Sequence, residues 1–401
     1  MKPKLVFAVL VACAAVILAV AAAEVILRFR AAPRGAIRFD NRLYPYVMFR
    51  PLESATYISA ETFAMSHHQH RVHHYTNEDG FRVPSPDYKL PREKPAGQLR
   101  LAVLGASAVQ LGSTYDTTLP GSLRRVLREK YPGRDIEVIN AGVTSSVSRQ
   151  SVVQFLLTVS AYHPDIVILY DGVNDIGLPI TYESRPNFPY NFQTMEEAWD
   201  LYRRDYQEPL WKLALHRSYL YQGIRARLAG PVRLARTDSP AIGPNALPAQ
   251  RVLQDQALVR QHIRAYLSNW TKLVELSEVY RFRPVCVLQP TGALEGDFAP
   301  ALLVKEFRLT EEAARQWMAA LSALYGEADR QIEALRATHP KAAFINLRDS
   351  LKPAEQHYWD LVHVYDETNL LIAERLFIEI KPLVEMRKRL PPVTSSASAI
   401  R

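Results

Sequence analysis

The sequence is poor in cysteine and carries only a small excess of charge. Of its 401 residues only Cys13 and Cys286 are cysteines, and Cys13 lies in an apolar N-terminal run. This excludes a disulfide framework and a cysteine-rich zinc module. The 49 basic and 41 acidic residues give a net charge of +8, spread along the chain. So small an excess is not the signature of a nucleic-acid-binding protein, and we expect no nucleic-acid partner.

The first 30 residues predict a membrane anchor. An almost unbroken apolar run extends from Leu5 to Leu27, interrupted only by Glu24, and two lysines precede it. About 20 apolar residues suffice to cross a bilayer as a helix. Residues 1–30 are therefore predicted to be a single-pass transmembrane signal-anchor.

Two other interpretations of this segment stay open. Residues Ala21–Ala23 are typical of a cleavage site, which would make the segment a cleaved signal. Residues 10–13 resemble a lipoprotein box, but they fall too early in the apolar run. Basic residues flank the run on both sides, so the positive-inside rule does not decide its orientation. We expect the remainder of the chain to lie outside the cytoplasm, close to the membrane.

The rest of the chain predicts one α/β domain with flanking segments. Residues 31–95 are polar and irregular, which predicts a juxtamembrane lead-in with short strands around Thr56–Ser59. Residues 96–390 form the predicted domain, and an insertion rich in aromatic residues, Pro and Arg interrupts it at about 180–250. This insertion is either a cap over the active-site face or a surface excursion with its own small core. The tail, 391–401, is rich in Pro, Ser and Ala and is expected to be disordered.

Short apolar strands alternate with helical periods in the predicted domain. Such alternation favours right-handed crossovers and a parallel sheet that helices cover on both faces. The predicted strands are 99–105, 136–142, 165–172, 284–289 and 342–347. The predicted helices are 119–131, 148–162, 259–280, 311–337 and 366–386.

Chemically useful groups follow the predicted strands. Ser107 comes just after the first strand, Gly142 ends the second, and Asn174 follows the third. Asp360 and His363 stand just before the last helix. Because ligands bind outside the carboxyl ends of strands in open parallel sheets, we expect these groups to meet at one edge. They make a complete set for acyl transfer.

Each of these groups answers a need of that reaction. The Ser107 hydroxyl is a weak nucleophile unless a base takes its proton, and His363 is the candidate base. Asp360, three residues earlier, is placed to bond one ring nitrogen and fix the tautomer. The backbone N–H groups of Ser107 and Gly142 and the amide of Asn174 are the candidate oxyanion donors. His357 is a rival base near Asp360, but the Asp-x-x-His order favours His363.

With these residues in this order, the sequence resembles the SGNH (GDSL-type) hydrolases, in a membrane-anchored bacterial form. The segments that carry the resemblance are 100–107, 138–142, 164–168, 172–175 and 360–363. No single segment is specific, but four blocks in the right order with Asp-x-x-His last are a strong signal. The sequence departs from the family pattern at Ala106, where an Asp is usual, so the nucleophile loop is held differently.

The resemblance implies a flavodoxin-like three-layer α/β/α fold with a five-stranded parallel sheet. It further implies hydrolysis of an ester or transfer of its acyl group, often on carbohydrates or lipids, with neither a metal nor a cofactor. Ser107, His363 and Asp360 take the catalytic roles, and Ser107, Gly142 and Asn174 form the oxyanion hole.

A histidine-rich tract lies outside these blocks. Five of the eleven histidines occur in residues 66–74. Such tracts bind transition metals in some proteins, but here no carboxylate or cysteine is interleaved, and Arg71 stands in the middle. A solvated loop is the favoured interpretation, and we predict no metal site.

Three functions compete on the sequence alone. The first is a membrane-tethered esterase or acyltransferase that removes or moves a short acyl group, such as acetyl, on a carbohydrate or another envelope ester. The second is a lipase or lysophospholipase that uses the nearby bilayer. The third is a non-catalytic assembly protein with the same fold, for which Ala106 is the only hint. The full set of Ser107, Gly142, Asn174, Asp360 and His363 favours an enzyme.

Overall fold

The computed structural model describes residues 3–30, 56–59, 72–182, 184–188, 246–296 and 298–386, with single positions between 218 and 243. The chain divides into two units, Met1–Arg38 with Gln193–Ser239, and Phe39–Phe192 with Pro240–Arg401. The tail 391–401 and most of the insertion at 180–250 lie outside the described residues. Both interpretations of the insertion therefore stay predictions, as does the disorder of the tail.

The first unit contains helix α1 (Pro3–Arg30). Within it, Lys4–Leu27 is long and apolar enough to cross a membrane. The carboxylate of Glu24 accepts hydrogen bonds from the Ser218 hydroxyl at 2.8 Å and from the Leu220 backbone N–H at 2.9 Å. An N-terminal apolar helix is thus confirmed. Its retention as an anchor and its orientation stay predictions.

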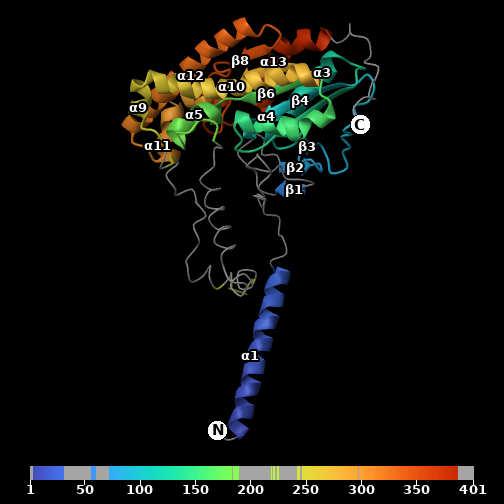
Figure 1. Cartoon of the computed structure of the whole chain (residues 1–401), viewed down its shortest axis with the longest axis vertical. Coiled ribbons are helices and arrows are strands. Elements are labelled where there is room, and N and C mark those ends of the chain that lie inside the picture. The colour runs from blue at the N-terminus through green and yellow to red at the C-terminus, as the bar shows by residue number, and fades with distance from the viewer. Residues whose placement is uncertain are drawn as a thin grey trace. The chain divides into compact units, whose positions relative to one another are not determined.

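One sheet forms the centre of the second unit (Figure 1). Its five parallel strands run in the order β5-β4-β6-β7-β8, which is the flavodoxin-like order. They are mostly runs of buried apolar residues, as expected for strands covered on both faces. These strands are β4 (Leu99–Gly105), β5 (Ile136–Gly142), β6 (Ile166–Asp171), β7 (Arg283–Leu288) and β8 (Ala343–Asn346). The predicted fold class is confirmed.

Three antiparallel strands extend the sheet beyond β5, so the described residues form eight strands rather than the predicted five. β2 and β3 form a hairpin, in which the Asn77 side chain accepts the backbone N–H groups of Asp79 and Phe81. β3 then pairs with β5. The added strands are β1 (Thr56–Ser59), β2 (Val72–Thr76) and β3 (Arg82–Val83).

The expectation of an irregular lead-in is therefore wrong for these strands, apart from the predicted strand at Thr56–Ser59. β2 and β3 are short and contain the polar residues His73, His74 and Arg82, so they lack the alternation of apolar and polar residues that would have predicted strands. His73 and His74 also contradict the prediction of a solvated histidine loop, because both lie in β2 and are half-buried. The rest of the histidine tract lies outside the described residues.

Helices cover both faces of the sheet (Figure 1). α3 and α13 bury their apolar sides on one face, and α4, α5, α10 and α12 bury theirs on the other. The predicted helices are confirmed to within a few residues, except that 148–162 divides into α4 and the 3-10 turn Val159–Tyr162. The helices are α2 (Ser107–Gln110), α3 (Leu119–Lys130), α4 (Ser148–Leu157), α5 (Val173–Thr181), α9 (Ala249–Gln254), α10 (Gln256–Tyr280), α11 (Phe298–Phe307), α12 (Glu311–Thr338) and α13 (Asp366–Met386).

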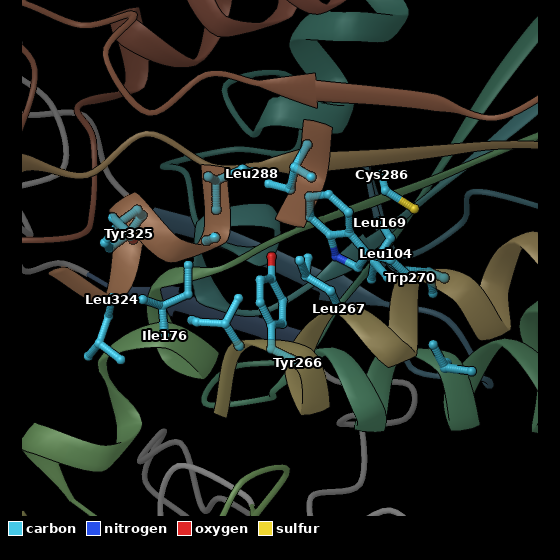
Figure 2. Packing of buried hydrophobic residues seen from close by; sticks show 14 of the residues in the cluster. Leu104, Leu169, Ile176, Tyr266, Leu267, Trp270, Cys286, Leu288, Leu324 and Tyr325 are labelled. Atoms are coloured by element: carbon cyan, nitrogen blue, oxygen red, sulfur yellow. The ribbon is translucent and has the colours of Figure 1, made fainter. Parts of the chain in front are cut away.

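The larger core lies between the sheet and α10 with α12. Figure 2 shows Tyr266 and Trp270 of α10 beside strand residues such as Leu169 and Leu288. Trp270 is fully buried. A side chain of this size contributes a large part of the apolar area that holds a helix to a sheet. This packing fixes the carboxyl end of β6, just before α5, whose first turn carries Asn174.

Candidate active site

The predicted nucleophile lies where β4 turns into α2. Ser107 is the first residue of α2 and is 8% exposed. Gly105, the last residue of β4, has φ +155°, and a Cβ atom there would lie 2.2 Å from the Tyr170 carbonyl oxygen. Only glycine fits so close to the neighbouring strand. The chain can therefore turn sharply and present the Ser107 hydroxyl at the carboxyl edge of the sheet.

His363 contacts this hydroxyl directly. The distance from its Nε2 atom to Ser107 Oγ is 2.7 Å, and Nδ1 lies 2.6 Å from Asp360 Oδ2. We assign the tautomer from this network, with Nδ1–H donating to the carboxylate and Nε2 accepting from the serine. Ser107, His363 and Asp360 thus form one continuous chain of hydrogen bonds. The structure brings together all three residues that the sequence analysis named for nucleophile, base and carboxylate.

Backbone hydrogen bonds hold the Asp360 carboxylate in position beside the imidazole of His363. Its Oδ1 atom accepts the backbone N–H groups of Val362 at 2.7 Å and His363 at 2.6 Å. Burial alone would raise the pKa of Asp360. The hydrogen bond to the His363 ring, the charge of that ring and the two backbone N–H donors together outweigh burial, so the pKa of Asp360 is lowered. The carboxylate therefore stays ionised, as is needed to stabilise a charged imidazole.

Two aromatic residues, Trp359 and His357, come just before Asp360 in the chain. The indole of Trp359 stacks on the His363 ring, with 5.0 Å between centroids and 16° between planes. Sequence reasoning missed Trp359, because no motif marks it. The rival His357 lies away from the hydrogen-bond chain, and its Nδ1 atom is 3.4 Å from the Thr368 hydroxyl. Burial lowers the pKa of His357.

Of the predicted oxyanion donors, Gly142 is the last residue of β5 and Asn174 lies in the first turn of α5. The Gly142 N–H donates to Asn140 Oδ1 at 3.1 Å, and a Cβ atom on Gly142 would lie 2.5 Å from the Gln110 backbone nitrogen. The Asn174 side-chain amide donates to the Ser146 carbonyl at 2.8 Å. Asn174 has a second amide hydrogen, whereas Gly142 must exchange its hydrogen bond to donate to an oxyanion.

Asp175 connects the first turn of α5, which carries Asn174, to the start of α4. Its carboxylate accepts the backbone N–H of Ser148 at 2.9 Å and the Ser148 hydroxyl at 2.6 Å. The N-cap residue of α4 is Val147, whose side chain has no polar atom, so Asp175 caps this helix from a neighbouring element. The predicted structural role of Asp175 agrees with these contacts.

A second buried carboxylate, Asp171, lies four residues before Asp175. Asp171 Oδ1 accepts from the Tyr266 hydroxyl at 2.7 Å and Trp270 Nε1 at 3.0 Å. Burial, reinforced by Asp175, raises the pKa of Asp171 well above its usual value. Burial also raises the pKa of Asp175, to about 7, against the hydrogen bonds from Ser148. The folded protein therefore holds protons that the unfolded chain has lost.

This excess of bound protons predicts that stability falls as the pH rises from about 6.5 to 8. The buried His74 and His262, whose pKa values are lowered to about 3 and about 4, oppose the effect as long as the unfolded chain still binds their protons, up to about pH 7.5. This opposing contribution is the same in wild type and in Asp175→Asn, so it cancels when the two proteins are compared. Thermal unfolding of the full chain should therefore show a Tm lower at pH 8 than at pH 6.5, with a smaller difference in Asp175→Asn. An equal difference in both proteins would contradict this assignment.

No family model matches the chain, and no curated protein matches its sequence. Several solved structures are similar to it. An alpha/beta hydrolase enzyme from the metagenome of Lake Arreo, Spain, is 12% identical with a TM-score of 0.38, over 72% of this chain and 97% of that one. An acetylxylan esterase from Geobacillus stearothermophilus is 13% identical with a TM-score of 0.33, over 70% and 94% of the two chains. Likenesses of this size do not assign an activity to this chain.

Proposed function

We propose that this protein is a serine esterase of the SGNH type that works through an acyl-enzyme on Ser107. The observation that carries the proposal is the hydrogen-bond chain from Ser107 Oγ through His363 to Asp360, with distances of 2.7 and 2.6 Å. A structural serine has no need of a base that is itself oriented by a carboxylate. This constellation is recognised by geometry and roles on unrelated folds.

In the first half-reaction, Ser107 Oγ attacks the carbonyl carbon of the ester and its proton passes to His363 Nε2. The carbonyl oxygen becomes an oxyanion, and its proposed donors are the backbone N–H of Ser107, the side-chain amide of Asn174 and, after it exchanges its bond to Asn140, the N–H of Gly142. The intermediate then breaks its bond to the alcohol oxygen. That oxygen takes the proton from His363 and leaves, and the acyl group stays on Ser107.

In the second half-reaction, a water molecule attacks the acyl carbon and gives its proton to His363. The bond to Ser107 Oγ breaks, the serine takes the proton back, and the acid leaves. A sugar hydroxyl in place of water would make the same protein an acyltransferase. Asp360 keeps its negative charge throughout and stabilises the imidazolium that forms in each half-reaction.

The proposed substrate is a short acyl ester, such as acetyl, on a carbohydrate or another component of the cell envelope. The N-terminal helix supports a site near a membrane, and we propose a single-pass protein whose catalytic domain lies outside the cytoplasm. A lipase or lysophospholipase is the alternative enzyme. The hydrogen bonds of Ser107 and His363 weigh against a non-catalytic assembly protein.

Acyl-chain preference tests the substrate class. The full chain in detergent micelles is assayed on aryl esters from acetyl to dodecanoyl, with Ser107→Ala as the background control. We expect kcat/KM to be highest for acetyl and to fall with each longer chain. A maximum at long chains would favour the lipase alternative. Turnover equal in both proteins would mean that Ser107 is not the nucleophile.

A further inference from the structure

The helix that carries Ser107 is too short to hold itself in place. α2 has four residues, and helices of this length are unstable without outside contacts. Its single turn is closed by the Leu111 N–H bonded to the Ser107 carbonyl at 2.8 Å, and by the Val109 and Gln110 N–H groups, which both bond the Ala106 carbonyl at 3.1 Å. The 2.7 Å contact between Ser107 Oγ and His363 Nε2 therefore depends on what fixes α2 from outside.

Two side chains from the neighbouring strands bond the carbonyl groups at the end of this turn. Arg82 Nη1 donates to the Gln110 carbonyl at 2.5 Å, and Arg82 Nη2 donates to the Gly112 carbonyl at 2.7 Å. Asn140 Nδ2 donates to the Val109 carbonyl at 3.0 Å. These carbonyls would otherwise lack partners at the end of the helix.

Arg82 and Asn140 form one structural unit. They are direct partners across the pairing of β3 with β5, and they are 2% and 1% exposed. Arg82 Nη2 also donates to the His73 carbonyl in β2 at 3.1 Å, which ties the hairpin to the same place. Burial lowers the pKa of Arg82 to about 10, opposed by Asp366, so the guanidinium stays charged at neutral pH. Charged donors make stronger hydrogen bonds to carbonyls than neutral ones.

Asn140 also reaches the oxyanion side of the site. Its Oδ1 atom accepts the Gly142 N–H at 3.1 Å, while its Nδ2 atom holds Val109 of α2. The backbone of Gly142 is packed against Gln110, the last residue of α2. Any shift of α2 therefore moves the nucleophile and one candidate oxyanion donor together.

We propose that Arg82 and Asn140 form a clamp that positions the Ser107 nucleophile. Both are positioning residues, because they act through α2 and do not touch the reacting atoms. The inference rests on the proposed function of Ser107 and goes beyond it, since it gives a positioning role to β3, one of the antiparallel strands added to the parallel sheet, together with its partner β5. A misplacement of about 1 Å commonly costs a reaction about 10²-fold.

The test uses the full chain in detergent micelles and the variants Arg82→Met, Arg82→Lys and Asn140→Asp. Arg92→Met is the matched control, because Arg92 lies in the same segment but has a side chain that is 57% exposed and pairs with Asp79, away from α2. Two rates are measured. One is turnover of the acetyl ester, and the other is labelling by a fluorophosphonate, in which Ser107 Oγ bonds to phosphorus and fluoride leaves with the serine proton.

We expect Arg82→Met to lower kcat and the labelling rate by about 10²-fold with KM changed less than about twofold. Arg82→Lys retains the charge and should lie in between. Added guanidinium should restore part of the rate to Arg82→Met but not to Ser107→Ala. Asn140→Asp keeps the acceptor for Gly142 and loses the donor to Val109, so it tests the clamp if Arg82→Met fails to fold.

Normal rates in folded Arg82→Met or Asn140→Asp would overturn the clamp. So would a lower Tm with unchanged kcat, because that is the result of a purely structural role. A wild-type protein that is not labelled at all would instead refute the proposed function. The two failures are therefore distinguishable.

Discussion

Ser107→Ala is expected to lower turnover of the acetyl ester by at least about 10⁴-fold, because removal of a triad nucleophile leaves only binding and oxyanion stabilisation. The Ser107 side chain is small and the replacement leaves the backbone of α2 unchanged, so folding should be preserved. The measurement is kcat and KM of the full chain at one pH, with circular dichroism and Tm to confirm folding.

Ser160→Ala is the matched control for this variant. The Ser160 hydroxyl is partly exposed and bonds the Leu156 carbonyl, away from Ser107 and His363, so activity should stay within about twofold of wild type. A Ser107→Ala protein that keeps more than a tenth of the wild-type kcat would place the nucleophile elsewhere.

Asp360→Asn is expected to lower kcat by about 10⁴-fold with little change in KM. An amide at this place can donate to His363 Nδ1, which favours the tautomer that carries its proton on Nε2. Nε2 can then no longer accept the proton of Ser107. The same amide must also accept the backbone N–H groups of Val362 and His363, which leaves its nitrogen toward the ring.

Two measurements separate this effect from a general loss of structure. The double variant Asp360→Asn with His363→Ala should be about as active as His363→Ala alone, because triad residues act as a unit. Fully additive losses would contradict a shared role. The Tm of Asp360→Asn should also stay close to that of wild type, since Asp360 and His363 are both partly open to solvent, with side chains 21% and 22% exposed.

The sequence was sufficient to predict the parallel sheet and the chain of hydrogen bonds from Ser107 through His363 to Asp360. The parallel strands are runs of apolar residues, and their carboxyl ends necessarily share one edge. Ser107 and His363 are 256 positions apart, yet topology alone brings the ends of β4 and the segment before α13 together. The spacing of Asp360 and His363 is local, so their contact was also predictable.

The sequence was insufficient where polar residues are buried. Arg82 and Asn140 belong to strands, but their side chains donate hydrogen bonds to backbone carbonyls in and just after α2. No periodicity in the sequence predicts these bonds. His73 and His74 were predicted to be solvated because histidine is a polar residue. They are instead part of a strand, because their backbone groups pair with β1. The hydrogen bond of the Gly142 N–H to Asn140 is equally invisible, since it depends on one side-chain rotamer.

The most direct test of the central claim is the intact mass of the full chain after reaction with a fluorophosphonate, followed by peptide mapping. The account predicts a single adduct on the peptide that contains Ser107, formed in wild type and Ser160→Ala and absent from Ser107→Ala. An adduct on another residue, or no adduct in a protein that hydrolyses the acetyl ester, would contradict it.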